Sequence, residues 1–132
     1  MKALSSPMQQ LEEFAEIRRK IQKNRGVIQV TGCIDPQKPH FISCSAQGYS
    51  HRVIITYSDL RAKELYENYR FFDRDVLYFP AKDLIFFQAD IHSNLLEQQR
   101  IAVLKALVEK EEVTVITTMA ACMNHLVPFE HW

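Results

Sequence analysis

The sequence predicts an α/β fold: an open, mostly parallel sheet of about four strands with helices on both faces. Short segments rich in β-branched residues alternate with longer segments that carry apolar residues at helical spacing. The segments expected to form strands are almost continuously apolar, which is typical of strands buried on both faces of a sheet. Because strand and helix alternate along the chain, we expect parallel strands joined by right-handed crossovers.

The composition fits one globular domain with no basic excess. The 132 residues are 47% hydrophobic and 24% charged, and 16 Lys and Arg balance 16 Asp and Glu. Proteins dedicated to nucleic acid usually carry a basic excess, which this chain lacks. The sequence contains no apolar run of the ~18 residues that a membrane helix needs, and its start lacks the apolar core of a signal peptide. The three cysteines include no CxxC pair, which favours a reducing compartment, so we expect a cytoplasmic protein.

The segment from about Met8 to Asn24 is predicted to form a helix. Its apolar face consists of Met8, Leu11, Phe14, Ala15, Ile17 and Ile21. Acidic residues lie in the first half and basic residues in the second, which suits the helix dipole, and Gly26 ends the helix. The basic residues from Arg18 to Arg25 could face phosphates, but a solvated helix end explains them more simply.

A strand, a helix and a second strand are expected next. Residues 27–31 are β-branched and bounded by glycines, which is typical of a strand. Residues 36–47 suit a helix with Asp35 as its N-cap, and Gly48 would end it. Residues 52–57 form the second predicted strand.

The remaining elements alternate in the same way. We expect a helix over about 60–71, a strand over 76–79, a long helix from about 93 to 110, a strand over 113–117 and a short helix over about 119–126. The long helix is expected to face the core with Leu96, Val103, Leu104, Leu107 and Val108.

The turn after the first expected strand is where open α/β sheets usually bind ligands. It runs from Gly32 to Pro39, and the phosphate-loop pattern G-x-x-x-x-G-K-[ST] fits it in part. Gly32 and Lys38 fill the first glycine and the lysine of the pattern. Gln37 replaces the second glycine, and Pro39 replaces the hydroxyl residue. The spacing alone fits an unrelated strand–helix turn equally well.

These two departures remove the means of binding a nucleotide. Phosphate loops present consecutive backbone N–H groups to the anion, and Pro36 and Pro39 each lack one. Gln37 cannot adopt a glycine-only conformation cheaply, and Pro39 has no hydroxyl to hold magnesium. Asp35 adds a negative charge where the phosphates would lie. We therefore interpret Gly32, Gln37, Lys38 and Pro39 as a vestigial phosphate loop, and expect this chain to have no catalytic residue, cofactor or metal.

Other side chains give weaker indications of chemistry. His40 and Cys44 could share one helix face as metal ligands, but a structural zinc site needs four. The cysteines Cys33, Cys44 and Cys122 could act as nucleophiles with a histidine, although cysteine more often serves as a small buried residue.

Aromatic pairs and one acid–histidine pair are open to two interpretations. Phe71-Phe72 and Phe86-Phe87 could stack nucleic-acid bases, yet no basic residues are regularly interleaved with them, so we expect packing. Asp90 and His92 could act as an orienting carboxylate and a base, and the start of a helix explains them equally well.

Four blocks of sequence together resemble the N-terminal, UvrB-like segment of the bacterial transcription-repair coupling factors (Mfd). They are residues 30–38, 66–72, 78–94 and 115–118, which read VTGCIDPQK, YENYRFF, YFPAKDLIFFQADIHSN and VITT. The resemblance covers the chain from about Gly26 onward. It implies a UvrB-like α/β domain over 26–132, and the helix predicted above then makes 1–25 a separate N-terminal helix.

The resemblance implies a fold like a RecA-type helicase lobe with a degenerate phosphate loop, and a non-catalytic scaffold role. The parent of such a segment is an ATP-dependent DNA translocase that displaces stalled RNA polymerase and recruits UvrA in nucleotide excision repair. ATP, magnesium, DNA, RNA polymerase and UvrA would be bound by other domains of that parent. In UvrB an aromatic hairpin that clamps DNA follows the third strand. Here only the residues from Pro80 to Ile91 separate that strand from the long helix, which are too few for such a hairpin.

The same resemblance implies a piece of a bacterial cytoplasmic protein that ends before its sheet is finished. We expect it to self-associate or to expose an apolar patch, formed by Leu126, Val127, Phe129, Trp132, Phe86 and Phe87. A small nucleotide-binding α/β enzyme or flavodoxin-like module is the alternative, and the Gln37 and Pro39 pair argues against it. A DNA-binding module that uses Arg18 to Arg25 is a third reading, against which the zero net charge argues.

Overall fold

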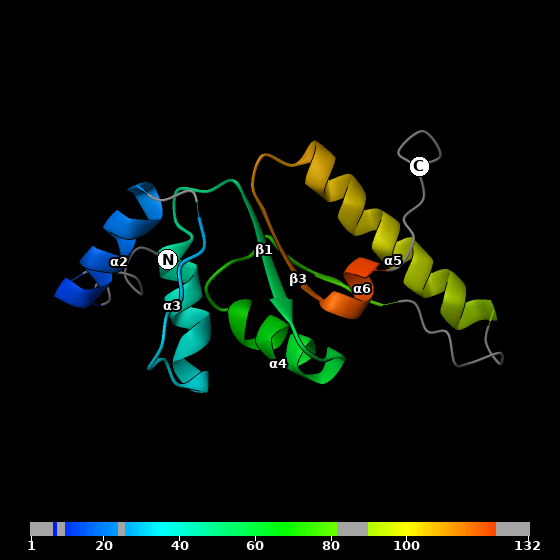
Figure 1. The fold of residues 1–132 in the computed structure, drawn as a ribbon. Helices are drawn as coiled ribbons and strands as arrows, with labels where there is room; N and C mark the ends of the chain where they lie inside the picture. Colours follow the sequence, from blue (N-terminus) through cyan, green and yellow to red (C-terminus); the bar gives the residue numbers. More distant parts are fainter. Residues whose placement is uncertain (1–6, 8–9, 24–25, 82–89, 124–132) are drawn as a thin grey trace.

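The computed structural model describes residues 7, 10–23, 26–81 and 90–123 of the chain (Figure 1). In chain order its elements are α2 (Glu12–Lys23), the 3₁₀ turn η1 (Asp35–Gln37), α3 (Lys38–Ser45), β1 (His51–Thr56), α4 (Asp59–Tyr69), β2 (Val76–Phe79), α5 (Asp90–Glu109), β3 (Val113–Thr118) and α6 (Met119–Met123). Within the described part of the chain, no helix is long and apolar enough to cross a membrane.

The sheet has three parallel strands in the order β1–β3–β2. β3 is the central strand, and all six of its residues are buried because helices cover both of its faces. Val115 lies opposite Val53 on one side and Leu77 on the other, so these three side chains share one face of the sheet. The expected α/β class with parallel strands is thus confirmed, and three of the four expected strands form close to their predicted bounds.

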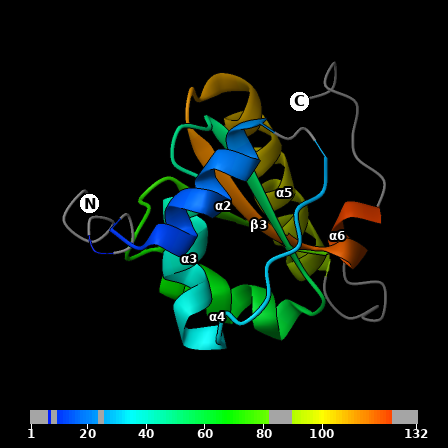
Figure 2. The same cartoon turned by 60° about the vertical axis from the view of Figure 1, so that its left-hand side comes forward.

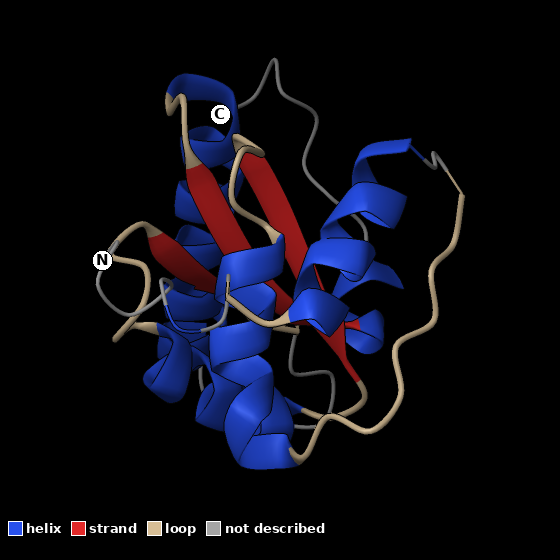
Figure 3. Cartoon of the chain, turned by 90° about the vertical axis from the view of Figure 1, so that its left-hand side faces the viewer, coloured by secondary structure: helices blue, strands red, loops and turns tan. Residues whose placement is uncertain are grey.

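The first expected strand, residues 27–31, does not form. These residues run as an extended segment that pairs with no strand in the described part of the chain, and Val27 is 97% exposed. In Figure 3 this tan segment, which follows α2, runs apart from the red strands. A β-branched run gains its stability from packing against neighbours on a sheet, and here it has no neighbouring strand.

Helices cover both faces of the sheet, as expected. On one face α4 packs Ala62, Leu65 and Tyr69 against Val76 and Ile116. On the opposite face α5 and α6 place Val103 and Ala121 against a second set of buried residues, namely Phe79, Val113 and Val115. Figure 1 shows α4 and α5 on either side of the strands.

The helices α2 and α3 extend the α4 side of the molecule. They lie side by side in both views of the ribbon (Figures 1 and 2). The ring of Phe14, which is buried, meets that of Phe41 edge to face with centroids 6.1 Å apart. The helix predicted over about 8–24 is thus present as α2. Among its described residues only Phe14 is buried, and this side chain packs α2 against α3 rather than against the sheet.

Candidate functional site

The vestigial phosphate loop, residues 32–39, lies at the surface between the extended segment and α3. Gly32 has φ of +83°, in the left-handed region that glycine adopts without strain. Gln37, by contrast, has φ of −87° and ψ of −19°, an ordinary right-handed conformation. The second glycine of a phosphate loop is therefore not needed at this backbone geometry.

The backbone N–H groups of residues 36–39 are not available to an anion. The Gln37 N–H donates to the Ile34 carbonyl at 3.0 Å, and the Lys38 N–H donates to the Asp35 carbonyl. Pro36 and Pro39 have no N–H. The turn η1 thus uses internally two of the donors that a phosphate loop would direct at its ligand.

The loop also carries its own anion. The Asp35 carboxylate lies 2.7 Å from the Lys38 ammonium and 3.4 Å from the Arg61 guanidinium. The hydrogen bond from Lys38, followed by the charges of Lys38 and Arg61, lowers the pKa of Asp35 below its ordinary value. Arg61 in turn lies 3.2 Å from Glu64. The lysine that would meet a phosphate is therefore paired within the chain.

Arg18 does not belong to a solvated helix end, which corrects the expectation for the basic end of α2. Its guanidinium donates to the carbonyls of Cys44, Ser45 and Gln47 at 3.1, 3.3 and 3.0 Å. These carbonyls belong to the last turn of α3 and the residues after it, where the helix dipole favours a cation. Arg18 thus caps α3, a role that no local pattern could reveal because its partners lie 26 to 29 residues away.

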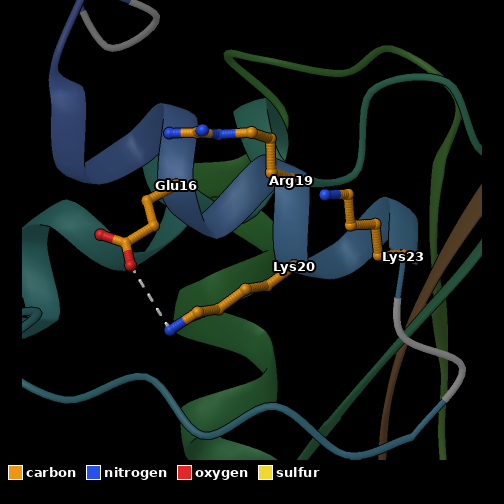
Figure 4. Close-up of a pocket in the computed structure, with 4 residues that line it drawn as sticks. All are labelled: Glu16, Arg19, Lys20 and Lys23. Atoms are coloured by element: carbon orange, nitrogen blue, oxygen red, sulfur yellow. Dashed lines mark ion pairs between the residues drawn. The ribbon is translucent and has the colours of Figure 1, made fainter.

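The other cations of α2 border an open hollow of about 370 Å³ (Figure 4). Arg19, Lys20, Lys23 and Glu16 line it. The Lys20 side chain is directed at Glu16, with 3.7 Å between the charged atoms. Arg25 lies outside the described residues. Because Arg18 binds α3, the described cations at this hollow are Arg19, Lys20 and Lys23.

A groove of about 550 Å³ follows the outer edge of β2, between α4 and α5. Its lining residues are Lys63, Tyr66, Glu67, Leu77, Tyr78, Gln99, Ala102, Val103, Ala106 and Lys110. The Tyr78 hydroxyl donates to Asp59 at 3.2 Å, and burial, followed by the Asp59 charge, raises the pKa of Tyr78 to about 12. Tyr78 thus stays protonated at neutral pH and does not act as a base in the groove.

Arg100 is a buried residue that the sequence-based reading of α5 missed. It is 3% exposed, donates to the carbonyls of Pro80 and Ala121, and lies 4.2 Å above the Phe79 ring centroid. It joins the carboxyl ends of β2 and β3, where open sheets usually bind ligands. Arg100 lies four residues after Leu96 and three before Val103, so helical spacing places it on the apolar face of α5. This spacing is the sequence signal from which its burial could have been predicted.

His40 and Cys44, which the sequence offered only as a weak option for metal ligands, make other contacts. His40 stacks on the Phe72 ring at 5.2 Å, and Cys44 is buried, which raises the pKa of its thiol. Among the described residues there is no group of three or more side chains that could hold a metal ion. Cys33 is half-buried within the loop, and Cys122 is exposed on α6.

The aromatic pairs and the acid–histidine pair are only partly described. The packing expected of Phe71 and Phe72 is confirmed for Phe72, which stacks on His40, and is wrong for Phe71, which is 72% exposed. Phe86 and Phe87 lie outside the described residues, as do the side chains of Asp90 and His92. The expected patch residues Leu126, Val127, Phe129 and Trp132 also lie outside them.

Comparison with known proteins adds no assignment to this site. No protein-family model, no curated protein and no solved structure matches the chain.

Proposed function

We propose that this chain is a non-catalytic, UvrB-like scaffold domain of a transcription-repair coupling factor. The parent would be an ATP-dependent DNA translocase that displaces stalled RNA polymerase and recruits UvrA. The four sequence blocks carry the resemblance, and the three-stranded parallel sheet with helices on both faces is compatible with it. The scaffold would position the neighbouring domains of the parent, which bind ATP, DNA and protein partners.

One observation supports the non-catalytic role above all others. The loop whose spacing resembles a phosphate loop pairs its lysine with its own Asp35 at 2.7 Å. In a working loop, that lysine and the preceding backbone N–H groups bind the phosphates and the following hydroxyl binds magnesium. Here the N–H groups of Gln37 and Lys38 close the turn, and Pro39 offers neither a donor nor a hydroxyl.

We further propose that the fold is a partial RecA-type helicase lobe. Its parallel order β1–β3–β2 and its helical crossovers support this assignment. The extended residues 27–31 would correspond to the strand that leads into the phosphate loop. They would enter the sheet only when strands from elsewhere in the parent lie beside them.

A calorimetric titration with Mg-ATP tests the proposal. The wild-type chain is expected to show no binding up to about 1 mM Mg-ATP. A dissociation constant above this concentration corresponds to a binding free energy weaker than about −4 kcal/mol. Micromolar binding would contradict the scaffold role and favour the nucleotide-binding α/β enzyme or the flavodoxin-like module.

Two variants sharpen the titration. The Gln37→Gly/Pro39→Thr double variant restores the pattern but keeps Asp35, so it is expected to stay close to wild type. Adding Asp35→Asn removes the internal anion and should give measurable, salt-sensitive phosphate binding. If the double variant already binds as tightly as the triple variant, the internal carboxylate does not oppose the ligand.

A further inference from the structure

The helix α2 is held to its neighbour α3 by a small set of side chains. Of its 12 residues only Phe14 is buried, and Ile17, Arg18 and Ile21 are half-buried. The Phe14 ring meets the Phe41 ring of α3, and Arg18 donates to three carbonyls at the end of the same helix. The attachment of α2 to α3 therefore centres on one aromatic contact and one guanidinium.

The chain that leads from α2 to α3 adds little to this attachment. None of residues 26–34 is buried, and they pair with no strand in the described part of the chain (Figure 3). Segments with few buried apolar contacts and an exposed backbone open at a low cost in free energy. Residues 26–34 can therefore act as a tether that lets α2 move without disturbing the sheet.

The helix α3, by contrast, is anchored without α2. Its Ile42 packs against the buried residues that α4 shares with β2 and β3. The His40 ring stacks on Phe72, which follows α4. Asp35, in the turn before α3, lies 3.4 Å from Arg61 of α4. On the α4 side of the molecule, the weakest junction thus lies between α2 and α3.

We propose that α2 is a latch, which detaches from α3 as one unit while the sheet and its other helices stay folded. Phe14 and Arg18 hold the latch closed. A helix of 12 residues is only marginally stable on its own in water, so the detached α2 loses its helical hydrogen bonds. Opening also frees the Phe41 ring and the last carbonyls of α3. This inference does not depend on the proposed function.

Native-state hydrogen exchange, followed residue by residue by NMR, tests the latch. Relative to their intrinsic rates, the amides of residues 16–23 in α2 should exchange at least about a hundredfold faster than those of Val115 and Thr117 in the central strand. Low concentrations of urea should change the exchange of α2 less steeply, because opening α2 exposes less surface than global unfolding does. Equal protection of α2 and β3, or no protection of α2, would overturn the proposal.

A variant in the core separates local opening from global unfolding. Val103 lies on the face of the sheet opposite α4, and this face stays folded whether the latch is open or closed. Val103→Ala should therefore speed exchange in β3 about tenfold and leave α2 within about twofold of wild type. Ile116→Val, a milder change in the core, should show the same pattern on a smaller scale. If exchange in α2 rises by the same factor as in β3 in these variants, α2 opens only by global unfolding and the latch is wrong.

A variant of the latch itself should behave differently. Arg18→Met destabilises the closed state relative to both the open and the unfolded states. It should therefore speed exchange in α2 and in β3 by a similar factor, at least about fivefold. Arg19→Met, at the exposed neighbouring position, is the matched control and should change neither rate by more than about twofold. Unchanged exchange of α2 in Arg18→Met would show that Arg18 does not hold the latch closed.

Discussion

Asp35 supplies from within the chain the negative charge that a phosphate loop takes from its ligand. Because Lys38 and Arg61 lower its pKa, the ion pair contributes to stability near neutral pH. That contribution is lost as the pH falls through the lowered pKa of the carboxyl group. The sequence alone pointed to the degenerate loop and to the Asp35 carboxylate within it. It could not reveal that Arg61 pairs with Asp35, because Arg61 comes from α4.

The first prediction concerns the pKa of Asp35. An NMR titration of its carboxyl carbon should give a pKa below the ordinary value, and Lys38→Ala should raise it towards that value. The control Lys63→Ala changes an exposed lysine of the same α4 helix that carries Arg61, and should leave the Asp35 pKa in place. A pKa that does not respond to Lys38→Ala would show that the pair does not form.

The second prediction concerns Arg100. Arg100→Met removes the donors to the carbonyls of Pro80 and Ala121 and the cation above Phe79. Leaving buried carbonyls unsatisfied should lower the free energy of unfolding by about 2–4 kcal/mol, measured by urea denaturation. Lys105→Met on the same helix removes only an exposed ion pair and should cost about 0.5 kcal/mol or less. Equal effects of the two substitutions would contradict the bridging role.

Elements differed in how far the sequence could predict them. The three strands that form were predicted because each is short, apolar and bounded by turn residues, and each also finds a partner in the sheet. Residues 27–31 have a similar composition but pair with no strand among the residues that the structure describes, so local propensity alone gave the wrong result. In α5 the stripe was placed correctly at Val103, whereas Val108 is 58% exposed and Arg100 takes a buried position instead.

The third prediction concerns the contact between α2 and α3. Arg18→Met removes three hydrogen bonds from a charged donor to the end of α3, and should lower the free energy of unfolding by about 1–2 kcal/mol. Hydrogen exchange should quicken in the last turn of α3. The neighbour Arg19 is exposed, so Arg19→Met should change stability by no more than about 0.5 kcal/mol. Comparable losses in both variants would mean that Arg18 does not cap α3.

The described cations of α2 form a small basic surface. With Arg18 used as a cap, the outward cations of α2 are Arg19, Lys20 and Lys23. The fourth prediction is that any DNA binding is weak and falls with salt with a log–log slope of about −2 to −3, as for three phosphate contacts. Fluorescence anisotropy at several salt concentrations measures it. A steeper slope that Arg18→Met reduces would show that Arg18 leaves its carbonyls to meet DNA.

Because the turn from Asp35 to Lys38 is closed by its own contacts, we expect the loop from Gly32 to Pro39 to bind no nucleotide. An NMR titration of the backbone amides with Mg-ATP tests it most directly, since it reports on the residues of the loop one by one. The amide resonances of Cys33, Ile34, Asp35 and Lys38 are expected not to move up to about 1 mM ligand. Saturable shifts confined to these amides, with a midpoint in the micromolar range, would contradict it.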